Sequence, residues 1–451
     1  MQRYNQYKSS GDSFVKSIPY HWKIDKLKRN CYLKGRIGWQ GLKHSEFSDD
    51  KNLPYLITGM NFKNGVIQWD EVYHISEERY NEAPEIQLKN GDILMTKDGT
   101  IGKLLFVENL PGKASLNSHL LVLRPLNNAY FPRYLYYQLL SEHFNNHIEL
   151  YKSGTTFYGL SQEDTGNFKI LLPPIEEQTI ISKYLDFKVG QIEKLIEDKE
   201  NLISILNEEH IAIINQAITR GLDTTVPIKH SGISWLGEIP ETWHANKIRY
   251  LSKSVKTGNT PPSEIIEYYL PQEIDWFTPG DFKDLKLINS KRKISQKAIE
   301  DGRCKLFPKN SVLMIGIGAT LGKIGIIDNP ASSNQQINCI VFDESKILPE
   351  FGAYFLTNYS TVTVSMASAS TLAILNQNQT KDLYITVPPI LEQEAILKFI
   401  SVESDRINSV RLKIDEEIEL LKEYKTALIS EVVTGKVDVR NEVITQSFTM
   451  A

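Results

Sequence analysis

The sequence predicts an α+β protein in which two mixed, mostly β domains are separated by two long antiparallel helices that form a coiled coil, with an internal pseudo-twofold repeat. Three observations lead to this class. Two stretches have apolar residues at heptad spacing, and each follows a region of short apolar runs and turn residues. The motifs of the first half then recur in the same order in the second half.

The first heptad stretch covers residues 176–221. Its apolar residues follow a 4-3-4-3 spacing, which is typical of the seam of a coiled coil, and Lys199 and His210 interrupt that seam. We interpret these two residues as register-setting or edge positions. The seam residues are Leu185, Val189, Ile192, Ile196, Ile203, Leu206, Ile213 and Ala217.

The second heptad stretch covers residues 391–435 and, like the first, begins inside a Pro-Pro-Ile-x-Glu-Gln motif. At about 1.5 Å per residue, each helix spans on the order of 65 Å. Because the second half repeats the first, the second helix is expected to run back beside the first, which makes the pair antiparallel. Its seam is predicted to contain Ile400, Ile407, Val410, Ile414, Leu421, Tyr424 and Leu428.

Five pairs of motifs establish the repeat. The offset between partners changes only from 221 residues at the first pair to 215 at the last, which indicates a duplication with small insertions and deletions in loops. The pairs are residues 18–22 with 239–243 (Ile-Pro-x-x-Trp), 57–62 with 277–282, 100–103 with 320–323 (Thr-x-Gly-Lys), 116–119 with 333–336, and 173–178 with 388–393.

The regions before the helices are predicted to be mostly strand. Short apolar runs at 92–96, 104–107, 120–123, 312–315, 324–327 and 338–342 are separated by turn residues, and helical patterns occur at 133–144 and 350–358. The predicted order is a first globular domain (1–175), a helix (176–221), a linker (222–238), a second globular domain (239–390), a helix (391–435) and a C-terminal tail (436–451).

Charge is unevenly distributed along the 451 residues. The net charge is −4, but the two helices together carry −8 and the remainder carries +4. This balance fits a DNA-binding protein whose contact surfaces lie outside the helices. Cys31, Cys304 and Cys339 are far apart in the sequence and are expected to be buried thiols. No apolar run approaches the length of a membrane span, so we expect a cytoplasmic protein.

The glycine-rich segment 316–323 (Gly-Ile-Gly-Ala-Thr-Leu-Gly-Lys) does not match a P-loop. Five residues separate Gly316 from Gly322 where that motif has four, and Ile324 stands where it requires Ser or Thr. The pattern favours a tight glycine turn between two strands. The alternative is that Thr100, Lys103, Thr320 and Lys323 contact DNA phosphates, which suits Lys and Thr on an exposed turn.

Catalytic motifs were sought and rejected. Asp281 and Lys283 have the Asp-x-Lys spacing of metal-dependent nucleases, but the repeat places Asn61 at the position of Asp281, and an amide is a weaker metal ligand. None of the three Pro-Pro pairs lies in an adenine-methylation motif. His143 and His147 are interpreted as surface histidines. We predict no catalytic residue and no metal ligand.

Polar, aromatic and basic residues on loops remain as candidates for binding. Residues 34–43 form a glycine-rich loop with Arg36, Trp39, Gln40 and Lys43, and Arg and Gln are the side chains that read guanine and adenine edges. The matching segment of the second half, 256–262, is shorter and different. Such divergence around a preserved framework suits two modules with different targets.

The order of these motifs resembles that of the specificity (S) subunits of Type I restriction-modification enzymes. The resemblance covers nearly the whole chain, because each half has the Ile-Pro-x-x-Trp entry, the Thr-x-Gly-Lys turn, an Asn-Gln-Gln-like segment and the Pro-Pro-Ile-x-Glu-Gln motif before a long helix. Residues 34–43 and 276–281 also resemble that family's recognition domains. No single motif is diagnostic, but the duplicated order is highly specific.

The resemblance implies two target-recognition domains that each read half of a split sequence in double-stranded DNA. It also implies that the helices fix the unread spacer and dock two DNA adenine methyltransferase (modification) subunits, with motor/nuclease (restriction) subunits joining to cleave. The chain itself would be non-catalytic and without a cofactor, since AdoMet and ATP are expected only on partner subunits.

DNA contacts are expected from loop and turn residues of both halves. The candidates are Arg36, Trp39, Gln40, Lys43, Thr58, Asn61, Lys97, Thr100, Lys103, Asn117, His119, Lys256, Asn259, Thr278, Thr320, Lys323, Asn334, Gln335 and Gln336. Two alternatives stay open at this point. One is a coiled-coil scaffold whose globular parts bind protein, and the other is a metal-dependent nuclease that uses Asp281 and Lys283.

Overall fold

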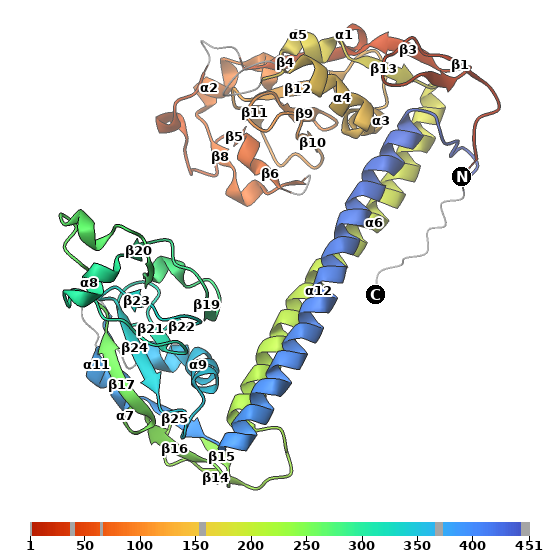
Figure 1. The fold of residues 1–451 in the computed structure, drawn as a ribbon. Coiled ribbons are helices and arrows are strands. Elements are labelled where there is room, and N and C mark those ends of the chain that lie inside the picture. The colour runs from red at the N-terminus through yellow and green to blue at the C-terminus, as the bar shows by residue number, and fades with distance from the viewer. Residues whose placement is uncertain (1, 37–40, 64–65, 153–158, 366–372, 443–451) are drawn as a thin grey trace. The chain divides into compact units, whose positions relative to one another are not determined.

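The computed structural model describes residues 2–36, 41–63, 66–152, 159–365 and 373–442. The chain divides into two compact units, the first formed by Met1–Glu200 with Asp415–Ala451 and the second by Asn201–Ile414. Each unit mixes strands and helices, so the protein is α+β with two domains. The long helices α6 (Ile175–Arg220) and α12 (Ile390–Val433) each contribute one segment to either unit, and their bounds confirm the two predicted long helices to within two residues (Figure 1).

The first unit is built mainly from short strands. Before α6 its elements are β1 (Tyr7–Ser9), β2 (Ser17–Pro19), β3 (Lys23–Lys26), α1 (Leu27–Asn30), β4 (Cys31–Gly35), β5 (Tyr55–Ile57), β6 (Phe62–Lys63), β7 (Val66–Ile67), β8 (Tyr73–His74), α2 (Glu77–Asn81), β9 (Ile93–Thr96), β10 (Leu104–Phe106), β11 (Ala114–Leu116), β12 (Leu120–Pro125), α3 (Pro132–Leu140), α4 (Glu142–Tyr151), α5 (Gln162–Gly166) and β13 (Lys169–Leu172).

The second unit follows the same order. Between α6 and α12 its elements are β14 (Ile228–His230), β15 (Glu238–Pro240), β16 (His244–Lys247), α7 (Ile248–Leu251), β17 (Ser252–Thr257), β18 (Ile274–Phe277), β19 (Lys286–Leu287), β20 (Lys293–Ile294), α8 (Gln296–Glu300), β21 (Val312–Ile315), β22 (Ile324–Ile327), β23 (Ser332–Ser333), β24 (Ile337–Phe342), α9 (Pro349–Asn358), α10 (Ser360–Ser365), α11 (Gln377–Asp382) and β25 (Tyr384–Val387).

Sheet topology repeats between the units. The first has a sheet of order β10-β9-β12-β4, and the second has the order β22-β21-β24-β17 within a five-stranded sheet that β19 extends. The parallel pair of β11 and β5 corresponds to the parallel pair of β23 and β18, and the antiparallel pair of β13 and β3 to that of β25 and β16. The predicted strands at 312–315 and 324–327 are confirmed at both ends.

Helices cover one face of each main sheet. In the first unit Leu135 of α3 and Phe144 of α4 share a buried cluster with sheet residues, and in the second unit Phe351 and Phe355 of α9 do the same. The predicted helix at 133–144 is in fact two helices, because Ser141 ends α3 and its side chain accepts a hydrogen bond from the Phe144 backbone N–H at the start of α4. The three cysteines are buried and free, as predicted.

His143 and His147 are not surface residues. Both are buried on α4, where His143 Nε2 lies 3.2 Å from an Asp12 oxygen and His147 Nε2 lies 2.8 Å from the Asp164 carbonyl oxygen. Burial lowers the pKa of both imidazoles. The prediction failed because both residues lie on the buried face of α4, whereas the helical pattern in the sequence was predicted to end at residue 144.

In each unit the Ile-Pro-x-x-Trp motif contacts the Pro-Pro-Ile-x-Glu-Gln motif. Glu177, in the first Pro-Pro-Ile-x-Glu-Gln motif, accepts hydrogen bonds from the fully buried Trp22 indole (3.0 Å) and the Tyr4 hydroxyl (2.7 Å), and lies 2.7 Å from His21 Nε2. In the second unit Glu392 accepts from the Trp243 indole at 2.9 Å. A buried indole N–H needs an acceptor, so the tryptophan and the glutamate form one joint between domain and helix.

The glutamine of the same motif makes a second link. The Gln178 carboxamide oxygen accepts from the Phe131 N–H at 2.8 Å, and its NH2 group donates to the Pro173 carbonyl at 3.0 Å. Gln393 repeats this with the Leu348 N–H and the Pro388 carbonyl, both at 2.8 Å. The motif therefore fixes the start of each long helix against the domain that precedes it.

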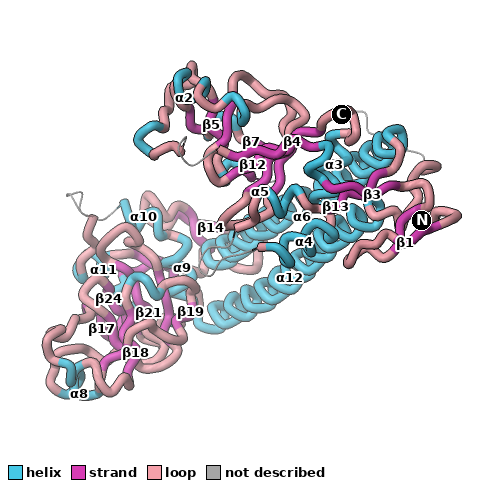
Figure 2. Tube along the Cα trace, turned by 90° about the horizontal axis from the view of Figure 1, so that it is seen from above, coloured by secondary structure: helices cyan, strands magenta, loops and turns pink. Residues whose placement is uncertain are grey.

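Segments of α6 and α12 pack side by side within each unit (Figures 1 and 2). In the first unit Lys425 Nζ lies 3.3 Å from a Glu193 carboxylate oxygen, and Lys199 pairs with Glu417. In the second unit Arg406 pairs with Glu209 at 3.2 Å. Residue numbers rise along one helix as they fall along the other, so the segments run antiparallel.

Most predicted seam positions are buried or half-buried, with two exceptions on α12. Leu185, Ile192 and Leu428 share one buried cluster. Val410 and Tyr424 are exposed instead, and Ile418 is buried. The prediction placed three-residue steps after Ile407 and Leu421, whereas four-residue steps lead to the half-buried Arg411 and Lys425. Among the described residues, no helix has both the length and the apolar character needed to cross a membrane.

Candidate nucleic-acid interface

A glycine turn at the end of the main sheet is common to both units. It joins β9 to β10 and β21 to β22, as expected for the tight-turn interpretation. Gly102 and Gly322 have φ values of 81° and 86°, which glycine adopts readily. A Cβ on Gly102 would also lie 2.6 Å from Ile148 Cδ1. The turn exposes Thr100, Lys103 and Lys323, while Thr320 is half-buried.

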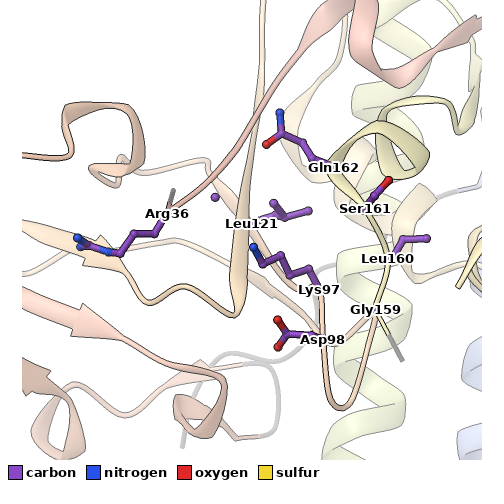
Figure 3. A pocket seen from close by; sticks show the side chains of 9 residues that line it. Arg36, Lys97, Asp98, Leu121, Gly159, Leu160, Ser161 and Gln162 are labelled. Atoms are coloured by element: carbon purple, nitrogen blue, oxygen red, sulfur yellow. The ribbon is translucent and has the colours of Figure 1, made fainter. Parts of the chain in front are cut away.

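Beside this turn, the first unit has a cavity of about 520 Å³ (Figure 3). We call it the first pocket, and its polar lining consists of Lys97, Asp98, Ser161 and Gln162. Asp98 is engaged by His119 Nδ1 at 2.7 Å. Within the part of the chain that the structure describes, Lys97 Nζ has no hydrogen-bond or ion-pair partner, so the pocket carries a free cation.

Arg36 lies at the edge of the first pocket but turns away from it (Figure 3). Its side chain is only 3 % exposed, and its guanidinium donates to the Leu116 carbonyl at 2.8 Å and to the Ser115 hydroxyl at 3.1 Å. Burial lowers its pKa to about 10. Arg36 follows directly on β4 and ties that strand to β11, so it is buried rather than exposed on a loop, and its contact with DNA stays a prediction.

The second unit has a cavity at the equivalent place. Sheet register pairs Gly35 with Leu121 in the first unit and Thr257 with Asn338 in the second. Leu160 N–H donates to the Lys97 carbonyl, and Leu375 N–H donates to the Gly316 carbonyl, both at 2.8 Å. This second pocket, of about 340 Å³, is lined mainly by amide side chains and a hydroxyl; its polar residues are Thr257, Gln335, Gln336, Asn338, Asn376, Gln377 and Asn378.

A third cavity of about 460 Å³ lies on the other side of the second unit's glycine turn. It shares Gln336 with the second pocket and adds two cations, Lys291 and Arg292. The Gln336 carboxamide oxygen accepts from Asn334 Nδ2 at 2.9 Å. Of the predicted residues, this cavity brings together Thr278, Thr320, Asn334 and Gln336.

Thr58 with Asn61, and Thr278 with Asp281, form the same turn in the two units. Asn61 Oδ1 accepts from the Thr58 N–H (2.8 Å) and hydroxyl (2.9 Å), and Asp281 Oδ2 accepts from the Thr278 N–H (2.7 Å) and hydroxyl (2.8 Å). The other Asp281 oxygen accepts from the Lys291 N–H at 3.0 Å. Asp281 is thus a capping residue, and the described residues contain no group of three potential metal ligands.

The remaining predicted residues that the structure describes lie on loops, except Lys256, which lies on β17. Lys43 and Lys256 are exposed, and Asn117 and Asn259 are half-buried. The Gln335 carboxamide oxygen accepts a hydrogen bond from the Thr260 hydroxyl. Thr260 is not one of the residues that line the second pocket. Trp39 and Gln40 lie outside the described residues.

The sequence analysis missed several lining residues, among them Gln162, Thr257 and Gln377. Gln162 and Gln377 are 215 residues apart, the offset of the Pro-Pro-Ile-x-Glu-Gln motifs. Extending that motif match backward would have found them. Thr257 could be identified only from its pairing with Asn338 across the sheet.

Comparison with known proteins agrees with this repeated architecture. The family model described as "Type I restriction modification DNA specificity domain" matches residues 40–203 and again residues 240–420. The chain is 24% identical over 448 residues to a putative type I restriction enzyme MjaX specificity subunit of Methanocaldococcus jannaschii, covering 94% of this chain and 96% of that protein. It is 20% identical to the type I restriction enzyme StySPI specificity subunit of Salmonella potsdam, covering 93% and 90%.

Solved structures share the fold. A chain solved in a study of complex assembly and conformational transition of the type I R-M system superposes with a TM-score of 0.67 at 17% identity, covering 93% of this chain and 99% of that chain. The HsdS subunit from Thermoanaerobacter tengcongensis gives a TM-score of 0.53 at 15% identity, covering 93% and 98%. The resemblance drawn from the motif order is thereby confirmed: the chain belongs to the family of the Type I restriction modification DNA specificity domain and carries that domain twice.

Proposed function

We propose that this chain is the sequence-specific DNA-binding subunit of a Type I restriction-modification complex. It reads a split target in double-stranded DNA, one half-site per unit, and docks two adenine methyltransferase subunits; motor/nuclease subunits join for cleavage. The observation that carries the proposal is the pair of equivalent pockets. Their backbone frame is the same in both units, but one holds a cation and the other a set of amides. Such a pair suits two different base sequences.

The long helices act in this proposal as an antiparallel coiled coil that belongs to the internal pseudo-twofold repeat of the chain. Buried or half-buried residues follow a heptad seam on both helices, and Lys199 and His210 occupy seam positions where they reach Glu417 and Ser404 of the partner helix. Polar residues at such positions specify register. A fixed register makes the helices suitable as a ruler for the unread spacer.

Exposed apolar residues on the helices support docking of two copies of one partner. In the first unit Leu195, Leu420 and Tyr424 are exposed, and in the second unit Ile205 and Val410 are exposed. Leu195 corresponds to Val410, and Ile205 to Leu420, at the offset of 215 residues. Apolar groups left in solvent at equivalent places are typical of interfaces. Two equivalent patches suit two methyltransferase subunits.

No residue of this chain is assigned a catalytic role or a cofactor. AdoMet and ATP belong to the partner subunits in this proposal. The nuclease alternative is not favoured, because both Asp281 carboxylate oxygens already accept hydrogen bonds, Oδ2 from the Thr278 N–H and Oδ1 from the Lys291 N–H. The scaffold alternative is not favoured either. Binding of a protein partner does not explain why the unpaired Lys97 cation lies in a pocket beside the turn that exposes Thr100 and Lys103.

The test is base-resolved sequencing of methylated DNA from the host, with the gene present, deleted and restored. We expect adenine methylation at a motif of two defined half-sites separated by a constant unread spacer, lost on deletion and regained on restoration. Methylation that does not depend on the gene, or a continuous motif without a spacer, would contradict the proposal.

The ruler role has a separate test. Insertion of one heptad into both α6 and α12 adds about 10 Å of helix and should lengthen the spacer by about 3 base pairs. The matched control inserts the heptad into α6 alone, which shifts the seams out of register and should abolish methylation. A spacer that stays the same in the double insertion would exclude the helices as the ruler.

A further inference from the structure

The second pocket contains a hydrogen-bond chain whose donors and acceptors can be counted. Asn338 lies on β24 and is buried. Its NH2 group donates to the Leu375 carbonyl at 2.8 Å and to the Thr380 hydroxyl at 2.9 Å, and its carboxamide oxygen accepts from the Thr257 hydroxyl at 2.7 Å. Both amide hydrogens are thus in use. Asn338 is a fixed support for Thr257.

Thr257 in turn holds the side chain of Gln377. Its hydroxyl donates its one hydrogen to Asn338 and accepts from Gln377 Nε2 at 2.8 Å. One of the two N–H groups of Gln377 is therefore occupied. Among the described residues, the second N–H and the carboxamide oxygen of Gln377 have no partner, and both belong to a half-buried side chain that lines the pocket.

A free N–H beside a free carbonyl oxygen on one amide is the pair that recognises adenine. Asn and Gln donate to adenine N7 and accept from its N6 amino group in the major groove. A side chain that is already fixed in the free protein loses less conformational entropy on binding than a freely rotating one. Thr257 and Asn338 supply that fixation for Gln377.

The first pocket has the same glutamine without the support. Gln162 occupies the position of Gln377, but Gly35 stands where Thr257 would hold it, and Leu121 stands in place of Asn338. Lys97 occupies the position of Gly316 and brings a cation into the pocket. The first unit thus lacks the fixed amide, and its free cation suits the O6 and N7 acceptors of guanine.

We propose that Gln377, positioned by Thr257 and Asn338, reads an adenine in the half-site recognised by the second unit, and that the equivalent first pocket lacks this preference. The inference rests on the proposed function and deepens it by naming a specificity-determining residue and the base that it selects. Gln377 would contact the base, while Thr257 and Asn338 are positioning residues.

The test uses the full chain in its own host, with Gln377→Ala restored to a deletion strain and methylated sites mapped at base resolution. We expect selectivity for one A·T pair of one half-site to fall on the order of 5- to 150-fold, with the other half-site unchanged. Gln162→Ala is the matched control, because it removes the same amide from the first pocket and should leave the second unit's half-site unaltered. An unaltered motif in the Gln377→Ala strain would overturn the inference.

A second pair of variants separates reading from folding. Thr257→Val keeps the shape of the side chain but removes the hydroxyl, and it should weaken selectivity at the same A·T pair by less than Gln377→Ala does. Thr257→Ser retains the hydroxyl and should restore the wild-type motif. Thr257→Val that leaves selectivity intact, or that alters a different base pair, would also overturn the inference.

The two levels of the proposal can fail separately. If the unmodified gene directs no methylation, the proposed function fails. If it directs methylation at a bipartite motif that both Gln377→Ala and Thr257→Val leave intact, only the inference about Gln377 fails. Should Gln377→Ala abolish all methylation, Thr257→Val still tests the assignment.

Discussion

The two pockets show how one fold can be used twice with different chemistry. In the first unit Lys97 projects a cation beside Asp98, whereas in the second Gly316 leaves room for an amide network centred on Gln377. The strands that frame the pockets pair in the same register in both units. The joints that hold each domain to its helix are also alike. The strands around each pocket and the Trp–Glu joint to each helix are thus the same in both units, whereas the residues that line the pockets differ. This is expected if the lining residues select the DNA target.

The largest difference between the units is expected at the joints. Glu177→Ala would leave the buried Trp22 indole and Tyr4 hydroxyl without an acceptor, and each such group costs about 1–3 kcal/mol. Glu392→Ala would leave only the Trp243 indole without an acceptor. We expect denaturant unfolding, followed by tryptophan fluorescence, to show a loss of about 2–6 kcal/mol in the first unit.

The matched Glu392→Ala variant should lose about half as much stability in the second unit. Equal losses of unfolding free energy in the two units would mean that the additional hydrogen bond from Tyr4 does not contribute to stability. Glu177→Gln keeps an acceptor oxygen and should recover part of the loss.

A smaller effect on DNA binding is expected for Lys97→Ala. The change removes the free cation of the first pocket and should weaken binding to the cognate site by about 1–3 kcal/mol if Lys97 contacts a base. Gel shifts at several salt concentrations measure this, because a phosphate contact would instead weaken all sequences and reduce the salt slope by about one. Lys253→Ala, at an exposed lysine of the second unit that is not among the predicted DNA contacts, is the control and should leave binding unchanged. If Lys97→Ala binds DNA as tightly as the wild type, the Lys97 cation does not contribute to the difference between the two pockets.

Acid should destabilise the first unit more than the second. Burial lowers the pKa of His143 and His147 in the folded unit, so the unfolded chain takes up protons first as the pH falls through about 6.5. Their contribution is therefore present above that pH and is lost below it. Asp12, which faces His143 and Lys169, has a lowered pKa and acts in the same direction at lower pH.

The measurement is hydrogen exchange of both units between pH 5 and pH 8. The described histidines of the second unit, His210, His230 and His244, are at least partly exposed, so its exchange should depend less on pH after correction for the intrinsic rate. Parallel pH dependence in both units would contradict the assignment. His143→Phe should flatten the profile of the first unit.

The smallest effect is expected on the helices. Lys199→Ala removes the pair with Glu417, whose side chain is largely exposed, and should change stability by less than about 1 kcal/mol. Unfolding of the variant measures this. A loss well above that range would assign Lys199 a larger part in holding the seam than an exposed ion pair can supply.

Much of the fold was predictable because it depends on local patterns. The strands at 312–315 and 324–327 and the two long helices follow from apolar runs and heptad spacing. Val410 and Tyr424 were wrongly assigned to the seam because the prediction placed the three-residue step of the heptad before the four-residue step. The spacing of apolar residues along one helix does not determine the order of these two steps. The break at Ser141 depends on a capping hydrogen bond that the helical periodicity conceals.

The site was less predictable because its residues act through distant partners. Arg36 lies in a glycine-rich segment, but its burial depends on the carbonyl of Leu116 on another strand. Gln377 gained its role from Thr257, which lies 120 residues away in the sequence. Lys97 was included as part of the repeated turn, yet its unpaired position in a pocket emerges only from the fold.

In the proposed function the two units read different half-sites with equivalent pockets. Base-resolved methylation mapping of Lys97→Ala and Gln377→Ala, each restored to the same deletion strain, tests it most directly. We expect each variant to relax selectivity in one half-site only, and the two affected half-sites to differ. Changes in the same half-site for both variants would contradict it.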